Sequence, residues 1–229
     1  MSVADVALDN DEIDSLPRAC IDVAGGQARH VVTMYNGMEV LCDTETESGG
    51  WIVFQRRTSR NVSFYHNWAS YKYGFGDLTG DFWLGLEKVH KLTANKRHEM
   101  RLDFITKNTS YYASYDRFRV LGNKENYTIF VSGYWGNAVD HMSGVSGQAF
   151  SANDRDNDLN KNVHCADQYH AGWWYTTSCN LVNPNGRWAT HVNKADGLDW
   201  SGYSDPITFV EMKIRPVDNH EMCPLYFEY

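Results

Sequence analysis

Residues 165–179 read Cys165-Ala-Asp-Gln-Tyr-His-Ala-Gly-Trp-Trp-Tyr-Thr-Thr-Ser-Cys179, and Asn183-Pro-Asn-Gly-Arg187 follows closely. This stretch belongs to a longer segment, from about residue 136 to 205, that is rich in Gly, Asn, Asp, Ser and Trp and has little periodic apolar pattern. A segment of this length without regular secondary structure is usually functional. We expect three features to hold it in place: a disulfide between its two cysteines, the packing of its tryptophans, and a bound ion.

The cysteines indicate the redox compartment. Cys20 and Cys42 bracket one short segment, Cys165 and Cys179 bracket another, and Cys223 is left over. Two disulfides across these segments would each contribute roughly 3 kcal/mol. The alternative is five buried free thiols in an intracellular protein.

Three sequons favour an extracellular, secreted protein. They begin at Asn61, Asn108 and Asn126, each beside turn-forming residues, and we predict glycosylation at all three. In that setting Cys223 is either a free thiol or a bridge between two chains.

Composition limits the class of protein. The 229 residues carry a net charge of −8, and aromatic residues make up 14% of them, which is too many for a disordered acidic chain. No apolar run approaches the length of a membrane span, and no cluster of Lys and Arg marks a nucleic-acid surface. We predict an acidic flexible tail over 1–16, one domain over 17–217 and a C-terminal tail over 218–229.

Short strands dominate the expected secondary structure. Alternating or β-branched apolar residues predict strands over 50–57, 99–105, 111–120, 127–133 and 208–215, and apolar residues at helical spacing predict a short helix over 87–92.

An acidic triplet, Asp154, Asp156 and Asp158, places carboxylates at every second residue. Calcium binds six to eight oxygens, and alternate side chains of an extended loop can converge on one ion. The triplet is not an EF-hand, because Leu159 replaces the turn glycine and Cys165 the bidentate glutamate. The alternative is a solvated acidic turn in which the aspartates cap local backbone.

Enzyme motifs are missing from the sequence. His98-Glu99 begins a zinc motif, but Leu102 stands where the second histidine belongs, and there is no nucleophile elbow, P-loop or dinucleotide fingerprint. We therefore expect binding without catalysis.

Several long motifs resemble those of fibrinogen-related domains, which include ficolins, tachylectins, angiopoietins and the fibrinogen β and γ chains. The resemblance runs in order from about residue 18 to 217. Its motifs are the 165–187 stretch, Cys42-Asp-Thr-Glu-Thr with Gly49-Gly-Trp-Ile-Val-Phe-Gln-Arg-Arg57, Tyr73-Gly-Phe-Gly-Asp-Leu-Thr-Gly-Asp-Phe-Trp-Leu-Gly85 and Met212-Lys-Ile-Arg-Pro216. It implies an α+β fold with a small N-terminal disulfide region, a central antiparallel sheet with short helices, and a loop-rich C-terminal region for calcium and ligand.

The resemblance also implies site residues. Calcium would take the carboxylates of Asp156 and Asp158 and backbone carbonyls near Asn160 and Asn162, whereas Asp154 is not a usual ligand of the family. The ligand pocket would centre on a bend at Ser178–Cys179, often a cis peptide in the family, with the backbone N–H groups of Cys179 and Asn180 aimed at one ligand oxygen. Its walls match Tyr169, Trp173, Lys194 and Ala195, and Trp174 is expected to pack in the core.

Two functions follow from the resemblance. The first is a secreted, calcium-dependent, pattern-recognition lectin of innate immunity that binds acetylated or anionic glycans on microbial or cell surfaces, with several domains in one oligomer supplying avidity. Lys194 stands where acetyl-binding members often have Tyr, so it could pair with an anionic group. The second is a protein-binding module that recognises a peptide or receptor through the same pocket.

Overall fold

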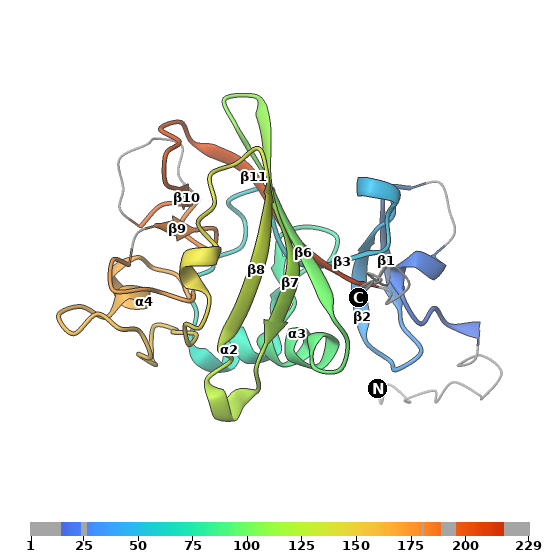
Figure 1. Ribbon diagram of the computed structural model, residues 1–229, viewed down its shortest axis with the longest axis horizontal. Helices are drawn as coiled ribbons and strands as arrows, with labels where there is room; N and C mark the ends of the chain where they lie inside the picture. The colour runs from blue at the N-terminus through green and yellow to red at the C-terminus, as the bar shows by residue number, and fades with distance from the viewer. Residues whose placement is uncertain (1–14, 24–26, 180, 189–195, 218–229) are drawn as a thin grey trace, which may run out of the picture.

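A computed structural model describes residues 15–23, 27–179, 181–188 and 196–217. Every strand of its main sheet is antiparallel to its neighbours, and the order is β1-β2-β3-β11-β6-β7-β8 (Figure 1). Those strands are β1 (Arg29–Thr33), β2 (Glu39–Asp43), β3 (Trp51–Arg57), β6 (His98–Thr106), β7 (Thr109–Val120), β8 (Ile129–Gly136) and β11 (Ile207–Pro216). Two short strands, β4 (Phe75–Gly76) and β5 (Phe82–Trp83), extend the sheet from β3.

The expected strands are present within a few residues of their predicted bounds. In β6 the side chains alternate strictly between buried and half-buried, as a strand with one face on the core requires. The last strand, β11, does not lie at an edge, because it pairs with both β3 and β6. The N-terminal and C-terminal parts of the chain are therefore joined through the centre of the sheet.

Short helices accompany the sheet: α2 (Trp68–Tyr73), α3 (Leu86–Thr93) and α4 (Cys165–Gln168). The side chain of Asn67 caps α2 by accepting a hydrogen bond from the Ser70 N–H at 3.0 Å. Helix α3, predicted over 87–92, buries Leu86, Val89 and Thr93 against the sheet. No helix of the described residues is long and apolar enough to cross a bilayer.

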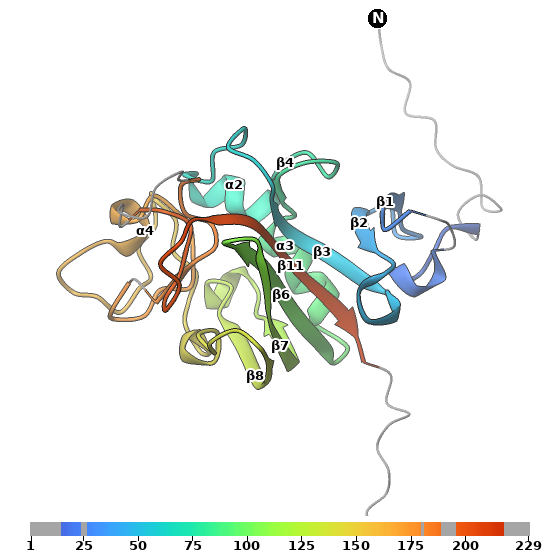
Figure 2. The ribbon, with the colours of Figure 1, turned by 90° about the horizontal axis from the view of Figure 1, so that it is seen from above.

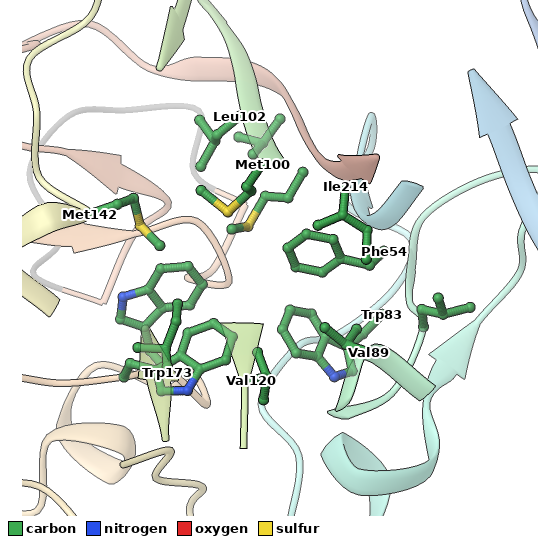
Figure 3. Packing of buried hydrophobic residues seen from close by; sticks show 14 of the residues in the cluster. Phe54, Trp83, Val89, Met100, Leu102, Val120, Met142, Trp173 and Ile214 are labelled. Atoms are coloured by element: carbon green, nitrogen blue, oxygen red, sulfur yellow. The ribbon is translucent and has the colours of Figure 1, made fainter. Parts of the chain in front are cut away.

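The core is aromatic and sulfur-rich. Phe54, Trp83, Met100 and Ile214 are buried together, and Trp173 reaches them from the C-terminal loops (Figure 3). The ring of Phe54 makes an edge contact with Trp83 at a centroid distance of 5.9 Å. Sheet and loops thus share one core.

A buried ionic network joins the N-terminal region to the sheet. The ammonium group of Lys213, on β11, lies 2.7 Å from Asp43, 2.8 Å from Asp103 and 3.1 Å from Glu211. Arg29 adds ion pairs with Asp43 at 2.8 Å and with Glu211 at 2.7 Å. Each of these carboxylates therefore has at least one cation in contact.

The disulfide Cys20–Cys42 is present and ties the N-terminal region to β2. This region and the loop-rich region around α4 lie at opposite ends of the sheet (Figures 1 and 2). Between residues 137 and 206 the described regular structure is limited to η4 (Ser143–Val145), α4 and the pair β9 (Val182–Asn183) and β10 (Asp199–Trp200). The irregular segment expected from the sequence is confirmed.

Candidate functional site

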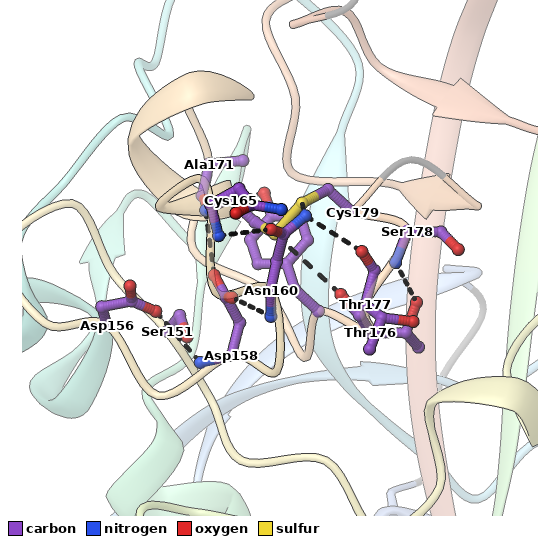
Figure 4. The surroundings of a disulfide bond; sticks show 12 residues. Ser151, Asp156, Asp158, Asn160, Cys165, Ala171, Thr176, Thr177, Ser178 and Cys179 are labelled. Carbon is purple, nitrogen blue, oxygen red and sulfur yellow. Dashed lines mark hydrogen bonds between the residues drawn. A yellow bond between two sulfur atoms is a disulfide. The ribbon is translucent and has the colours of Figure 1, made fainter.

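The acidic loop over residues 153–164 folds through a series of side-chain to backbone hydrogen bonds. Asp156 accepts from the Asp158 N–H at 3.1 Å, and Asp158 accepts from the N–H groups of Asn160 at 2.8 Å and Cys165 at 2.9 Å. The loop therefore approaches the start of α4 at Asp158, as Figure 4 shows.

Asp156 and Asp158 form a pair of like charges. Burial raises the pKa of Asp158, and the neighbouring Asp156 carboxylate raises it further, whereas hydrogen bonds from Cys165 and Asn160 lower it. A divalent cation between the two carboxylates would relieve their mutual repulsion. The pair thus supplies negative charge and part of the oxygen donors that calcium binds.

Backbone carbonyl oxygens of the same loop are available as further donors. Among the described residues, the carbonyl groups of Asn160 and Asn162 accept no hydrogen bond. The side-chain oxygen of Asn160, by contrast, is engaged, because it accepts a hydrogen bond from the Asn162 N–H at 2.9 Å. The residues present therefore fit calcium, through two carboxylates and free carbonyl oxygens.

Asp154 is directed away from this pair. Its carboxylate accepts a hydrogen bond at 2.7 Å from the N–H of Trp68, the first residue of α2. Within the described residues no three His, Cys, Asp or Glu side chains form a cluster that could hold a metal. The triplet thus divides into a pair of facing carboxylates and one helix cap.

Asn160 connects the acidic loop to the disulfide hairpin, residues 165–179. Its side-chain amide donates to the Thr177 carbonyl at 3.0 Å and to Cys179 Sγ at 3.4 Å (Figure 4). The Cys165–Cys179 disulfide closes the hairpin. Asn160 therefore contacts both the acidic loop and the hairpin that contains the bend at Cys179.

The bend itself differs from the expectation. The Ser178–Cys179 peptide is trans, and Cys179 adopts a positive φ of 59°. This turn directs the Cys179 N–H back into the hairpin, where it donates to the Thr176 carbonyl at 3.3 Å. The Ser178 N–H donates to the Thr176 side chain at 3.3 Å. The expected presentation of the Cys179 N–H to a ligand is therefore not observed in this conformation.

The expected wall residues separate into two groups. Tyr169 is buried but keeps 9% of its surface exposed, whereas Trp173 is only 1% exposed and packs edge-on against Trp174 at 5.1 Å. The backbone pairing of Trp173 with Ser151 draws its ring into the core, which is why it does not line a pocket wall here. Trp174 is buried, as expected. Asn180, Lys194 and Ala195 lie outside the described residues, as does Cys223.

Two residues that hold the acidic loop were not predicted from the sequence. The Arg155 guanidinium lies 4.1 Å from the centre of the Trp68 ring and donates to Asn126 at 2.7 Å. Asn157 donates from its side chain to the Phe150 carbonyl at 2.7 Å. Neither residue belongs to a recognisable motif, and each partner lies at least seven residues away in the chain.

The three sequons lie in different surroundings. Asn61 is exposed, and Asn108 is exposed in the turn between β6 and β7. Asn126 is half-buried, and its side-chain oxygen is already bonded to Arg155. Glycosylation of all three stays a prediction.

Known proteins share this sequence and fold. The family described as "Fibrinogen beta and gamma chains, C-terminal globular domain" matches residues 22–217. Fibrinogen C domain-containing protein 1-A of Xenopus laevis is 40% identical over 88% of this chain, and Tenascin-R of Homo sapiens is 40% identical over 81% of it. This chain spans 48% of the first protein and 14% of the second, about half or less of their lengths.

Solved structures agree with the sequence comparison. The fibrinogen-like globe domain of human ANGPTL6 superposes with a TM-score of 0.82 and 32% identity, covering 88% of this chain and 96% of that one. Lamprey fibrin D-dimer, complexed with the peptide Gly-His-Arg-Pro-amide, superposes with a TM-score of 0.75 and 25% identity over 99% of this chain and 84% of that one. The α+β fold with its N-terminal disulfide region is the one expected. This chain therefore belongs to the family of the C-terminal globular domain of the fibrinogen beta and gamma chains.

Proposed function

We propose that this domain is a calcium-dependent recognition module that binds acetylated or anionic glycans beside the Cys165–Cys179 disulfide, without catalysis. The observation that carries the proposal is the link formed by Asn160. Its backbone belongs to the loop that would hold the ion, and its side chain bonds the hairpin that would hold the ligand.

The ion would have two roles. It would neutralise Asp156 and Asp158, and it would draw the carbonyl groups of Asn160 and Asn162 inward. A shift of Asn160 would alter its bonds to Thr177 and Cys179, and so the position of the bend. Calcium dependence then follows from the connection between loop and hairpin, and does not require the ion to touch the ligand.

The hairpin offers polar groups to a ligand. Thr177 and Ser178 are exposed at the bend, and Tyr169 keeps 9% of its surface accessible. The Cys179 N–H is engaged by a 3.3 Å bond, which is long enough to be exchanged for a stronger acceptor such as a ligand carboxylate or acetyl oxygen. Lys194, from its sequence position, would add a positive charge for anionic sugars.

A secreted, extracellular setting is part of the proposal and rests on the two disulfides and the exposed sequons. Recognition of microbial or cell surfaces in innate immunity would require several such domains in one oligomer, because a single shallow pocket binds a small sugar weakly.

Peptide recognition is the second candidate, and one comparison favours it. The lamprey fibrin D-dimer that shares this fold is complexed with a four-residue peptide amide. A positively charged peptide terminus would find the carboxylates of this end of the domain, whereas an acetylated or anionic sugar would use the N–H donors.

A glycan array and a set of short peptides, each probed with multivalent protein in calcium and in chelator, separate the two candidates. Glycan binding that is lost in chelator and in Asp158→Asn supports the lectin function. The matched control is Asp154→Asn, which changes a neighbouring carboxylate outside the facing pair. Binding of peptides without binding of glycans would favour peptide recognition over the lectin function. Glycan binding by Asp158→Asn that persists in chelator would overturn the role given to the ion.

A further inference from the structure

A cavity adjoins the disulfide hairpin, because its lining residue Tyr65 donates a hydrogen bond to Asp167 at 2.5 Å and its lining residue His170 follows Tyr169. Its volume is about 400 Å³, and it is formed by the loop that follows β3 and by residues near β9. Six of its lining residues matter here: Arg57, Arg60, Tyr65, His170, Arg187 and Trp188. None of them belongs to the residue set assigned above to calcium or ligand.

Arg57 forms the charged floor of this cavity. Its side chain is 1% exposed, and its Nη1 donates to the carbonyls of Gly186 at 2.8 Å and Pro184 at 3.4 Å. The buried Nε has no hydrogen-bond partner. Among the described residues Arg57 forms no ion pair, and burial lowers its pKa to about 10. A buried guanidinium with an unused donor is a costly arrangement that a bound anion would relieve.

One carboxylate that interacts with Arg57, that of Asp81, is already engaged by other donors. Asp81 contributes to the electrostatics of Arg57, but its two oxygens accept four hydrogen bonds from Thr58 and Ser59, at 2.6 to 3.2 Å. Both oxygens of Asp81 are thus occupied by donors of the turn that follows β3. The face of Arg57 toward the cavity has no acid of its own.

The rim adds more positive charge. Arg60 is exposed, and the structure records no ion pair for it within its described part. Arg187 lies 3.3 Å from Asp196, and His170 lies 3.5 Å from the same carboxylate. Three guanidinium groups therefore line the cavity, and two of the described carboxylates lie beside its rim: Asp196 next to Arg187 and His170, and Asp167, which accepts a hydrogen bond from Tyr65.

Aromatic side chains flank these charges. Tyr65 is 39% exposed, and Trp188 is half-buried beside Arg187. The Arg57 guanidinium stacks on Phe64 at 3.9 Å, which leaves its edge free to donate in plane. Charged donors next to partly exposed aromatic rings suit a saccharide that carries an oxyanion, since the rings can contact the apolar face of the sugar.

We propose that this cavity binds the sulfate ester or carboxylate of an acidic saccharide, with Arg57, Arg60 and Arg187 as donors and Tyr65 and Trp188 against the sugar ring. This second site goes beyond the proposed function and needs no calcium. The two sites would allow one domain to contact two positions of an extended acidic glycan.

The test uses the full chain carrying Asn61→Gln, because Asn61 also lines the cavity and a glycan there would cover it. Galactose 6-sulfate, glucuronate and unmodified galactose are titrated in EDTA, with binding followed by NMR. We expect the two acidic sugars to bind at low ionic strength and to weaken in salt, and galactose not to bind. Equal binding of galactose and its sulfate would overturn the proposal.

Arg60→Gln and Arg187→Gln are the informative variants, since substitution of the buried Arg57 could prevent folding. Each should weaken binding of at least one acidic sugar roughly tenfold, the loss of one charge-assisted hydrogen bond. Arg117→Gln, an exposed arginine of β7 outside this cavity, is the matched control. Unchanged binding in both rim variants, or an equal loss in the control, would contradict the assignment.

A further variant separates this site from the proposed function. Asp158→Asn should abolish calcium-dependent binding and leave the sulfate response in EDTA unchanged. If Asp158→Asn removes both responses, the two sites are one and this inference fails. If Arg60→Gln and Arg187→Gln lose only the binding of acidic sugars in EDTA, the calcium-dependent function is unaffected and the second site is supported.

Discussion

Carboxylates occur in two contrasting settings at the two ends of the sheet. Around Lys213, three buried or half-buried acids share cations at 2.7 to 3.1 Å. In the acidic loop, Asp156 and Asp158 are neighbours, and within the described part of the chain only backbone N–H groups compensate them. The first group has its countercharge built into the chain, whereas the second has no cationic partner among the described residues. The proposed calcium site therefore concerns the second group.

The largest expected effect comes from removing the buried ammonium group of Lys213. Lys213→Met should lower the free energy of unfolding by about 3–5 kcal/mol, because it leaves Asp43 and Glu211 buried with less compensation. Urea denaturation measures this loss. Lys107→Met, which breaks an exposed contact with Asp205 at 4.0 Å, is the control and should cost less than about 1 kcal/mol. Equal losses in the two variants would erase the contrast between buried and exposed pairs.

Adding calcium should stabilise the domain through the acidic loop, at the opposite end of the sheet from the N-terminal region. Calcium at a hundred times its dissociation constant should stabilise the domain by about 2.7 kcal/mol, since it binds the folded state. Asp158→Asn should abolish this gain, and Asp154→Asn should retain it. Thermal unfolding with and without calcium measures the difference. A gain of the same size in Asp158→Asn would place the ion elsewhere.

Acid should weaken the internally compensated region selectively. Interactions with Lys213, and hydrogen bonds from Lys213 and Thr46, outweigh burial and lower the pKa of Asp43 from 3.8 to about 2. Since the folded value is the lower one, the stabilisation is fully present above pH 3.8 and is lost as the pH falls through 2. It amounts to about 2 kcal/mol. Urea midpoints between pH 5 and 2 should show this loss, and Asp43→Asn should flatten the curve. An unchanged slope in the variant would assign the acid sensitivity to other groups.

The smallest effect concerns the link between loop and hairpin. Asn160→Ala removes the hydrogen bonds to Thr177 and Cys179 and should cost about 1 kcal/mol of stability. Its more informative consequence is on ligand binding: calcium should still bind, but should no longer increase glycan affinity. Paired calorimetric titrations of calcium and glycan measure this uncoupling. Preserved calcium dependence of glycan binding would show that Asn160 does not transmit it.

Local patterns predicted the local structure well. Strict alternation identified β6, and the spacing of apolar residues identified α3, because each pattern reports which face of one element is buried. Helices α2 and α4 were not predicted, since six and four residues are too few to show a periodicity. The central place of β11 was equally inaccessible, because partners for a strand are chosen by distant surfaces.

The candidate site was predicted only in part. The paired cysteines and the facing Asp156 and Asp158 follow from short spacings and from the family resemblance. Trp173, however, packs in the core, because its backbone pairs with that of Ser151. The Cys179 N–H turns into the hairpin, because Cys179 has a positive φ and donates to the Thr176 carbonyl.

By itself, the sequence determined which residues are near one another along the chain: the alternating strands, the two disulfide loops and the carboxylates at every second residue. Tertiary structure alone decided that Asp154 caps α2, that Lys213 meets three acids and that Arg57 is buried beside a cavity. The physical reason is that spacing fixes local geometry, whereas burial and charge compensation depend on segments that lie as far as 86 to 170 residues apart in the chain.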